Sequence, residues 1–230
     1  MSVCIIADGG TNHKGDLNIA KRMIDEASKA GADYFSIYLE QTQSLVVNYN
    51  ACTELKQYCK NAGIGFLVSA PDVDSIDSFE NLDMDFWKVP LDKIKESSYL
   101  VKLGRTGRPV MLSTDMKNVE AIRNALLLLV GNGCSNITLL ESHTSFPTKY
   151  KEINLSTMGK MRDEFDVETG LSDRTQGVEI SLAAVALGAT VIEKPFTLDK
   201  KDEGPFHRYS LDVEEFAYMV KAIRHIEETK

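Results

Sequence analysis

The segment CIIADGGTNHKGDLNIAKRMIDEASKA, residues 4–30, decides the fold. It begins with four apolar residues in a row, a pattern typical of a short strand buried on both faces. After a Gly-rich loop, Asp16 is a favoured N-cap residue and begins a stretch with helical period. The residues that share one apolar face of this stretch are Leu17, Ala20, Met23, Ile24 and Ala27. The segment therefore predicts a strand followed by a helix.

The same unit recurs along the chain. Eight short apolar runs, each a candidate strand, lie at residues 4–7, 34–39, 65–69, 86–89, 109–113, 137–140, 167–170 and 190–193. Helical periods follow them at residues 16–30, 53–61, 74–81, 97–103, 119–130, 155–165, 179–187 and 213–228. Eight such units in 230 residues predict an α/β protein, a compact (β/α)₈ TIM barrel. No linker-like stretch interrupts the pattern, so we expect one domain over residues 1–230.

A doubly wound open sheet is the alternative architecture for alternating strands and helices. Its dinucleotide-binding form carries GxGxxG after the first strand and an acid further along the chain. The loop at residues 9–15, GGTNHKG, lacks that motif, and no acid stands at the corresponding place. The sequence therefore favours the barrel.

The composition limits the kinds of partner. The chain has 26 Lys and Arg against 34 Asp and Glu, a formal net charge of −8, which argues against nucleic acid as the main partner. No apolar run approaches the roughly 20 residues of a membrane span, and the N-terminus lacks the basic region of a signal peptide. The four cysteines form no CxxC motif. We therefore expect a cytoplasmic protein with reduced thiols and a small-molecule substrate.

The functional site of a (β/α)₈ barrel forms where the strands end and the following loops begin. The polar residues at those positions include Asp8, Asn12, His13, Lys88, Ser113, Glu141, His143, Ser172, Arg174, Glu193 and His207. Each of these residue types is also common in ordinary polar loops. Their convergence at one barrel mouth nevertheless favours carbonyl or phosphate chemistry on a small molecule over a flat interaction surface.

The chain resembles the catalytic barrel of the sialic acid (N-acetylneuraminate) synthases. The matching motifs follow one another in the family's order: IIADGGTNHKGD at residues 5–16, AGAD at 30–33, Lys88, PVMLSTDM at 109–116, GLSD at 170–173, AAVALGATVIEK at 183–194, FTLD at 196–199, GP at 204–205, and His207. The resemblance covers nearly the whole chain. It implies a barrel that condenses phosphoenolpyruvate with an N-acylated amino sugar in surface-carbohydrate biosynthesis.

The metal site is the main departure from this family. The resemblance implies two histidine ligands for a divalent metal, usually Mn or Mg, but Arg174 and Pro195 stand at those positions. Arg stays protonated, and Pro has no donor atom in its side chain. The sequence therefore predicts that the family's metal is lost or bound at a new place. A new site would use Glu141, His143, Asp8 and His207.

Further departures fall at positions where the family contacts its substrates. The family's first-strand glutamate is Asp8 here, and the other altered positions are Ser36, Tyr38, Ala70, Lys93, Thr144, Phe146 and Phe206. The chain is also shorter than the family after its second strand. It ends at Lys230, so we expect no C-terminal antifreeze-like domain, and a homodimer or a separately encoded capping domain as its partner.

The matched positions assign expected roles. The candidate catalytic residues are Asp8, Lys88 and Glu193. Asp8 and Glu193 would transfer protons, and Lys88 would hold an anion. The candidate substrate-binding residues are Asn12, Ser113, Ser172, Arg174, Glu141, His143 and His207. A fixed guanidinium at Arg174 could replace part of the lost metal charge, holding an anion or polarising a carbonyl. Its structural alternative is a salt bridge to Asp173 or Asp8.

Three functions stay open at this point. The first is a divergent phosphoenolpyruvate-dependent sugar-acid synthase. The second is a metal-free aldolase or lyase in which Lys88 forms a Schiff base, which requires a lowered pKa at that lysine. The third is a non-catalytic paralogue that binds a sugar or an anion.

Overall fold

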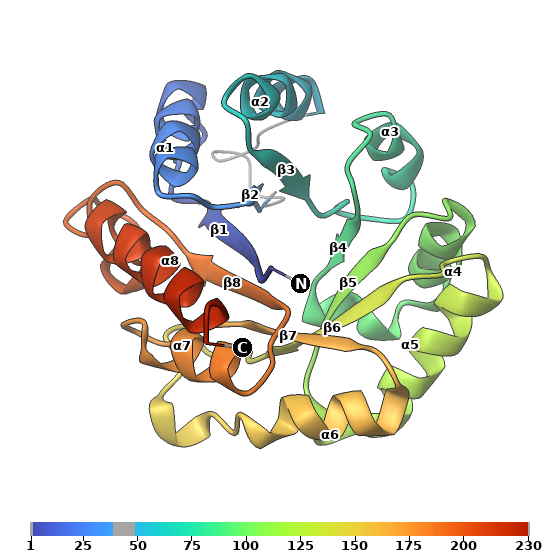
Figure 1. Ribbon diagram of the computed structural model, residues 1–230. Helices are drawn as coiled ribbons and strands as arrows, with labels where there is room; N and C mark the ends of the chain where they lie inside the picture. Colours follow the sequence, from blue (N-terminus) through green and yellow to red (C-terminus); the bar gives the residue numbers. More distant parts are fainter. Residues whose placement is uncertain (1, 39–48, 230) are drawn as a thin grey trace.

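Eight parallel strands form one sheet at the centre of the molecule (Figure 1). The computed structural model describes residues 2–38 and 49–229. The strands are β1 (Cys4–Gly10), β2 (Tyr34–Ile37), β3 (Gly65–Val68), β4 (Trp87–Val89), β5 (Val110–Thr114), β6 (Ile137–Ser142), β7 (Glu168–Ser172) and β8 (Val191–Pro195). Their hydrogen-bonded order is β3-β2-β1-β8-β7-β6-β5-β4, and the end strands β3 and β4 contact each other. The sheet is therefore a nearly closed barrel, and the predicted (β/α)₈ fold is confirmed.

The helices surround the barrel on its outside (Figure 1). They are α1 (Leu17–Lys29), α2 (Tyr49–Asn61), α3 (Ile76–Glu80), α4 (Ser97–Arg105), α5 (Val119–Gly131), α6 (Ser156–Phe165), α7 (Glu179–Ala186) and α8 (Val213–Glu227). Four short 3₁₀ helices, η1 (Leu91–Lys95), η2 (Met116–Asn118), η3 (Tyr150–Glu152) and η4 (His207–Tyr209), lie between them. Asp16 is the N-cap of α1, since its carboxylate accepts the backbone N–H of Asn18 at 2.7 Å.

Several strands extend further than the sequence predicts. The ladder of β6 continues through Ser142, that of β7 through Ser172 and that of β8 through Pro195. Polar side chains near the carboxyl ends of these strands interrupt the apolar runs, but backbone pairing does not depend on side-chain polarity, so the ladders continue past them. The predicted second strand included Leu39, which lies outside the described residues.

The core has two parts, one on each face of the sheet. The larger lies between the strands and the helices, as expected when helices cover a parallel sheet. The smaller fills the interior of the barrel with Ile6, Leu67, Phe86, Met111, Leu140 and Val191. These six side chains close the lower part of the barrel, so it is packed and not a pore.

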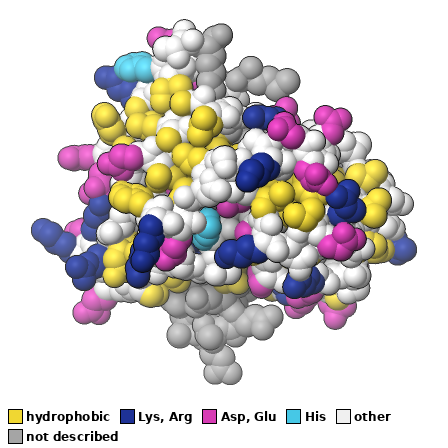
Figure 2. Space-filling view, turned by 90° about the horizontal axis from the view of Figure 1, so that it is seen from below, with side chains coloured by type: hydrophobic (Ala, Val, Ile, Leu, Met, Phe, Trp, Pro, Cys, Tyr) yellow, Lys and Arg dark blue, Asp and Glu magenta, His cyan; other side chains and the backbone are white. Residues whose placement is uncertain are grey.

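The surface carries charged side chains of both signs (Figure 2). On the face shown in Figure 2, Lys and Arg are interspersed with Asp and Glu. Across residues 2–38 and 49–229, no helix combines the length and the apolar character that crossing a membrane requires. All four cysteines are free thiols.

Candidate active site

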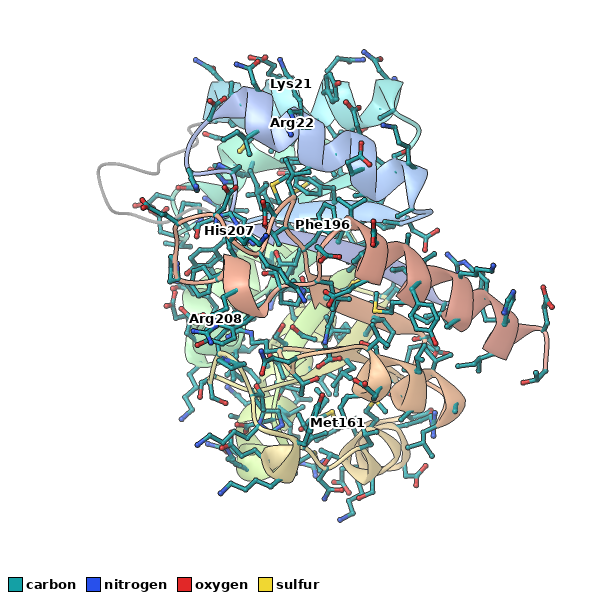
Figure 3. The ribbon with its side chains drawn as sticks, turned by 90° about the vertical axis from the view of Figure 1, so that its left-hand side faces the viewer. Lys21, Arg22, Met161, Phe196, His207 and Arg208 are labelled. Carbon is teal, nitrogen blue, oxygen red and sulfur yellow. The ribbon has the colours of Figure 1, made fainter. Side chains whose placement is uncertain are left out.

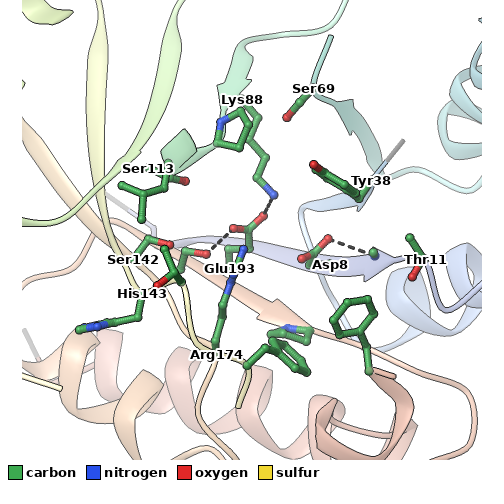
Figure 4. A pocket seen from close by; sticks show the side chains of 18 of the residues that line it. Asp8, Thr11, Tyr38, Ser69, Lys88, Ser113, Ser142, His143, Arg174 and Glu193 are labelled. Atoms are coloured by element: carbon green, nitrogen blue, oxygen red, sulfur yellow. Dashed lines mark hydrogen bonds and ion pairs between the residues drawn. The ribbon is translucent and has the colours of Figure 1, made fainter. Parts of the chain in front are cut away.

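A cavity of about 420 Å³ opens at the carboxyl ends of the strands (Figure 4). Its lining is rich in charged and hydroxyl groups: Asp8, Thr11, Asn12, Ser69, Lys88, Asp92, Ser113, Ser142, His143, Thr144, Ser172, Arg174, Glu193 and Ser210. Tyr38, Phe146 and Phe206 add aromatic surface. Volume and lining are those of a site for a small polar molecule.

The alternation of side chains along each strand explains why this lining is polar. Successive side chains of a strand point to opposite faces, so the residue two positions after an interior side chain also points inward. The six apolar side chains of the barrel interior are each followed, two residues later, by Asp8, Ser69, Lys88, Ser113, Ser142 or Glu193. A polar ring therefore lies directly above the apolar interior.

Lys88 and Glu193 form an ion pair across the centre of this ring (Figure 4). Both are largely buried, and Ser172 Oγ donates a hydrogen bond of 2.7 Å to the other carboxylate oxygen of Glu193. Burial by itself would lower the pKa of Lys88, but the charges of Glu193 and Asp8 more than offset it and raise that pKa. Lys88 is therefore a charged ammonium group in the described site.

Asp8 lies beside this pair, at the inner side of β1. Its Oδ1 accepts hydrogen bonds from Ser36 Oγ at 2.9 Å and from the Gly10 N–H at 3.1 Å. Among the described residues, no group donates to its Oδ2. This oxygen is therefore available to a bound molecule.

Arg174 is the second cation in the lining and comes from the loop after β7. Its side chain is half-buried. Neither of the salt bridges considered for it, to Asp173 or to Asp8, is present, and within residues 2–38 and 49–229 its guanidinium has no ion pair. The charge of Arg174 is thus uncompensated by direct contact, in contrast to that of Lys88.

A buried network fixes the loop that carries Arg174. Asp173 and Lys194 are fully buried and lie 2.8 Å apart on the outer side of β7 and β8. Asp173 also accepts hydrogen bonds from Thr175 N–H at 2.9 Å and from Ser181 Oγ at 2.6 Å. Lys194 donates a further hydrogen bond of 2.8 Å to Thr175 O. The residues on both sides of Arg174 are therefore held in place.

Two of the predicted substrate-binding residues lie in the lining with little freedom. The amide of Asn12 donates to Phe196 O at 2.9 Å and to Ser210 Oγ at 3.1 Å. These two hydrogen bonds connect the loop after β1 to the segment after β8. Ser113 is 4% exposed and lines the cavity from β5.

The predicted inward orientation of Glu141 is wrong. Leu140 packs inside the barrel and Ser142 lines the cavity, so the side chain between them points outward. Burial, with a smaller effect from the charge of Asp115, raises the pKa of Glu141 to about 8. His143 belongs to the lining, but its Nε2 faces Glu141 Oε1 at 3.3 Å, and burial lowers its pKa.

The two remaining histidines of the predicted site do not reach the cavity lining. His207 lies on η4, between β8 and α8 (Figure 3), where its Nδ1 is 2.7 Å from Thr197 Oγ1. His13 is fully buried and its Nδ1 accepts the Gly15 N–H at 3.0 Å, so it shapes its own loop. Both side chains therefore support loops next to the mouth.

Sequence reasoning missed Ser142, and it named Phe146 and Phe206, the aromatic wall of the cavity, as departures from the family without predicting that they meet. Counting two residues on from Leu140 identifies Ser142, provided that the strand is known to continue. Phe146 and Phe206 come from different loops and meet edge to face, with 5.0 Å between ring centroids. No local sequence pattern predicts that contact.

The residues present do not fit the divalent metal that the family resemblance implies. Arg174 and Pro195 both line the cavity, and neither side chain offers a ligand atom to a metal. Nor do the described residues contain a group of three or more His, Cys, Asp and Glu that could hold a metal ion. The alternative set of Glu141, His143, Asp8 and His207 is therefore not assembled.

The chain is similar over nearly its whole length to named sugar-acid synthases. The NeuB family model matches residues 17–230. The N,N'-diacetyllegionaminic acid synthase of Campylobacter jejuni is 37% identical over 253 residues, covering 97% of this chain and 76% of that enzyme. The N-acetylneuraminate-9-phosphate synthase of Homo sapiens is 30% identical over 251 residues, covering 97% of this chain and 70% of that enzyme.

Solved structures show the same fold. The N-acetylneuraminic acid (sialic acid) synthetase from Leptospira borgpetersenii, in complex with citrate, superposes with a TM-score of 0.93 at 27% identity. The match covers 100% of this chain and 85% of that chain.

Proposed function

The chain belongs to the NeuB family, and we propose that it condenses phosphoenolpyruvate with an N-acylated amino sugar, or a related aldose, to give a nonulosonate-type sugar acid. The observation that carries this proposal is the Lys88–Glu193 pair at the centre of a hydroxyl-lined cavity. Its setting suits a small, multiply charged substrate, since Lys88 and Arg174 supply cations and the serines supply neutral donors.

The reaction requires few groups, and the cavity holds candidates for each. C3 of the enolpyruvate forms a bond to the aldehyde carbon, whose oxygen takes up a proton. Water adds at C2 and loses a proton, and inorganic phosphate leaves with cleavage of its C–O bond. The protein must bind the anions, hold the two carbons in line and move two protons.

Asp8 is the carboxylate we assign to the proton of the attacking water. Its Oδ1 is fixed by Ser36 and the Gly10 N–H, which leaves Oδ2 open to the cavity. Glu193 has both oxygens engaged, by Lys88 and by Ser172. Its first task in this proposal is to hold Lys88, and it can take up a proton once the ammonium group turns to the substrate anion.

The aromatic wall gives a place for the apolar part of the acceptor. Phe146 and Phe206 line the cavity and contribute aromatic surface to it. An N-acyl methyl group packs favourably on such a surface, whereas a free ammonium group gains less from it. We therefore propose N-acylated sugars ahead of free amino sugars as acceptors.

The test is phosphate release from phosphoenolpyruvate across a panel of N-acyl hexosamines, with the keto acid product identified by mass. Lys88→Met and Glu193→Gln should lower kcat/KM by at least about 100-fold, since each leaves a buried charge without its partner. Glu168→Gln, an exposed site on β7, is the matched control and should retain the wild-type rate. Absence of phosphate release with every sugar, from folded wild-type protein, would refute the proposal.

The Schiff-base alternative is tested on the same protein. A nucleophilic lysine needs a lowered pKa, whereas neighbouring carboxylates raise that of Lys88. Borohydride reduction in the presence of pyruvate should therefore leave Lys88 unmodified in peptide mass mapping. An adduct on Lys88 would favour an aldolase or lyase.

A further inference from the structure

Arg174 differs from the other cation of the cavity, because it forms no ion pair with any residue that the structure describes. Lys88 is neutralised by Glu193, but among the described residues no carboxylate pairs with the Arg174 guanidinium. The side chain lines the cavity and is half-buried. In Figure 4 it reaches toward the Lys88–Glu193 pair from below. A fixed positive charge that is partly shielded from water and uncompensated attracts an anion or a carbonyl oxygen strongly.

The fold holds this guanidinium in place through its neighbours. Asp173 and Lys194, both fully buried, pair behind the loop, and Thr175 bonds to each of them. On the other side, the Thr148 N–H donates a hydrogen bond of 2.9 Å to Arg174 O. The backbone on which Arg174 stands is thus fixed before any ligand binds, and such preorganisation is what makes electrostatic stabilisation effective.

Within residues 2–38 and 49–229, no set of metal ligands lies beside this charge. Pro195 ends β8 and lines the cavity without a donor atom, and Arg174 would repel a metal ion. The nearby carboxylates are already engaged, Glu193 by Lys88 and Ser172, and Asp8 in part by Ser36. Among the described residues, the cation of this cavity that has no carboxylate partner is therefore the Arg174 guanidinium.

We propose that Arg174 replaces a divalent metal in this protein, so that it binds its anionic substrate without any metal. The identity of that substrate as phosphoenolpyruvate rests on the proposed function. The planar guanidinium can donate two parallel hydrogen bonds to a carboxylate or a phosphate.

The first experiment measures binding, not turnover. Protein stripped with EDTA is titrated with phosphoenolpyruvate, and separately with inorganic phosphate, by calorimetry. Wild-type protein should bind phosphoenolpyruvate in EDTA, and Arg174→Gln should weaken binding by at least about tenfold, since charged hydrogen bonds are lost. Arg174→Lys should recover part of the affinity. Arg22→Gln, at an exposed site on α1 (Figure 3), is the matched control.

The second experiment measures the metal itself. Mn²⁺ titrated into wild-type protein should retain the electron paramagnetic resonance signal of the free ion. The double variant Arg174→His with Pro195→His, which restores two imidazoles, should reduce that signal. Stoichiometric binding of Mn²⁺ by the wild type, or loss of phosphoenolpyruvate binding on chelation, would overturn the inference. So would wild-type affinity in Arg174→Gln, or a double variant that is folded and binds no Mn²⁺.

These outcomes separate the inference from the proposed function. Metal-free binding of phosphoenolpyruvate that depends on Arg174, with no phosphate release for any sugar, would refute the function and support the inference. Turnover that requires Mn²⁺ would support the function and refute the inference.

Discussion

Replacing Glu141 with glutamine should change how the stability of the protein depends on pH. Glu141 is 3% exposed, on the outer side of β6, and its Oε1 lies 3.3 Å from His143 Nε2. The charge of Asp115 raises the pKa of Glu141, and the charge of Lys117 lowers it. Glutamine has nearly the same shape as a protonated glutamic acid and cannot ionise.

The size and the sign of the expected change in stability follow from the raised pKa of Glu141. Burial raises the pKa of Glu141 from 4.5 to about 8 in the folded protein. Between these values the folded state holds a proton that the unfolded state has lost. The contribution of Glu141 is therefore fully present below pH 4.5 and is lost as the pH rises to about 8. The slope is about 1.4 kcal/mol per pH unit, so the loss between pH 5 and 7 is up to about 3 kcal/mol.

The assay is urea unfolding of wild type and Glu141→Gln at several pH values from 5 to 8. From pH 5 to 8, the free energy of unfolding of the variant should increase relative to that of the wild type by about 3–4 kcal/mol. Burial also lowers the pKa of His143, and that residue is present in both proteins. Glu168→Gln on the exposed side of β7 controls for the chemistry of the substitution.

A difference between variant and wild type that stays constant within about 0.5 kcal/mol across this range would refute the reasoning. It would mean that Glu141 is ionised in the folded protein, so that its carboxylate is stabilised by groups other than those in contact with it here.

Two further predictions concern the stability of the barrel. Lys194→Met should lower the free energy of unfolding by about 3–5 kcal/mol in urea, because it leaves the buried Asp173 carboxylate without its cation. Lys29→Met, which removes an exposed ion pair on α1, should cost much less than Lys194→Met, and equal losses in both variants would contradict the argument. Gly170→Ala should cost about 1–3 kcal/mol, because a Cβ there would lie 2.5 Å from Val191 O inside the sheet. An unchanged midpoint of thermal unfolding would show that β7 and β8 can separate without penalty.

The position of Glu141 shows where sequence reasoning fails. The apolar run ends at Leu140, so residues 141 and 143 were assigned to the mouth together. The strand in fact continues to Ser142, and because side chains alternate, Ser142 takes the inward place. Residues 140 and 142 share the inward face, so the error lay in the inward parity given to Glu141 and not in the length of the strand. The prediction that His207 lies in the site failed for a different reason. The path of a long loop depends on contacts with the rest of the protein.

The sequence alone determined the (β/α)₈ barrel, because eight short apolar runs alternate with helical periods along the chain. Only the tertiary structure decided which charges neutralise one another. Lys88 and Glu193 lie on different strands and meet across the interior when the barrel forms, which leaves Arg174 without a partner among the described residues. Periodicity is a local property of the chain, whereas charge pairing depends on distances that exist only in the folded barrel.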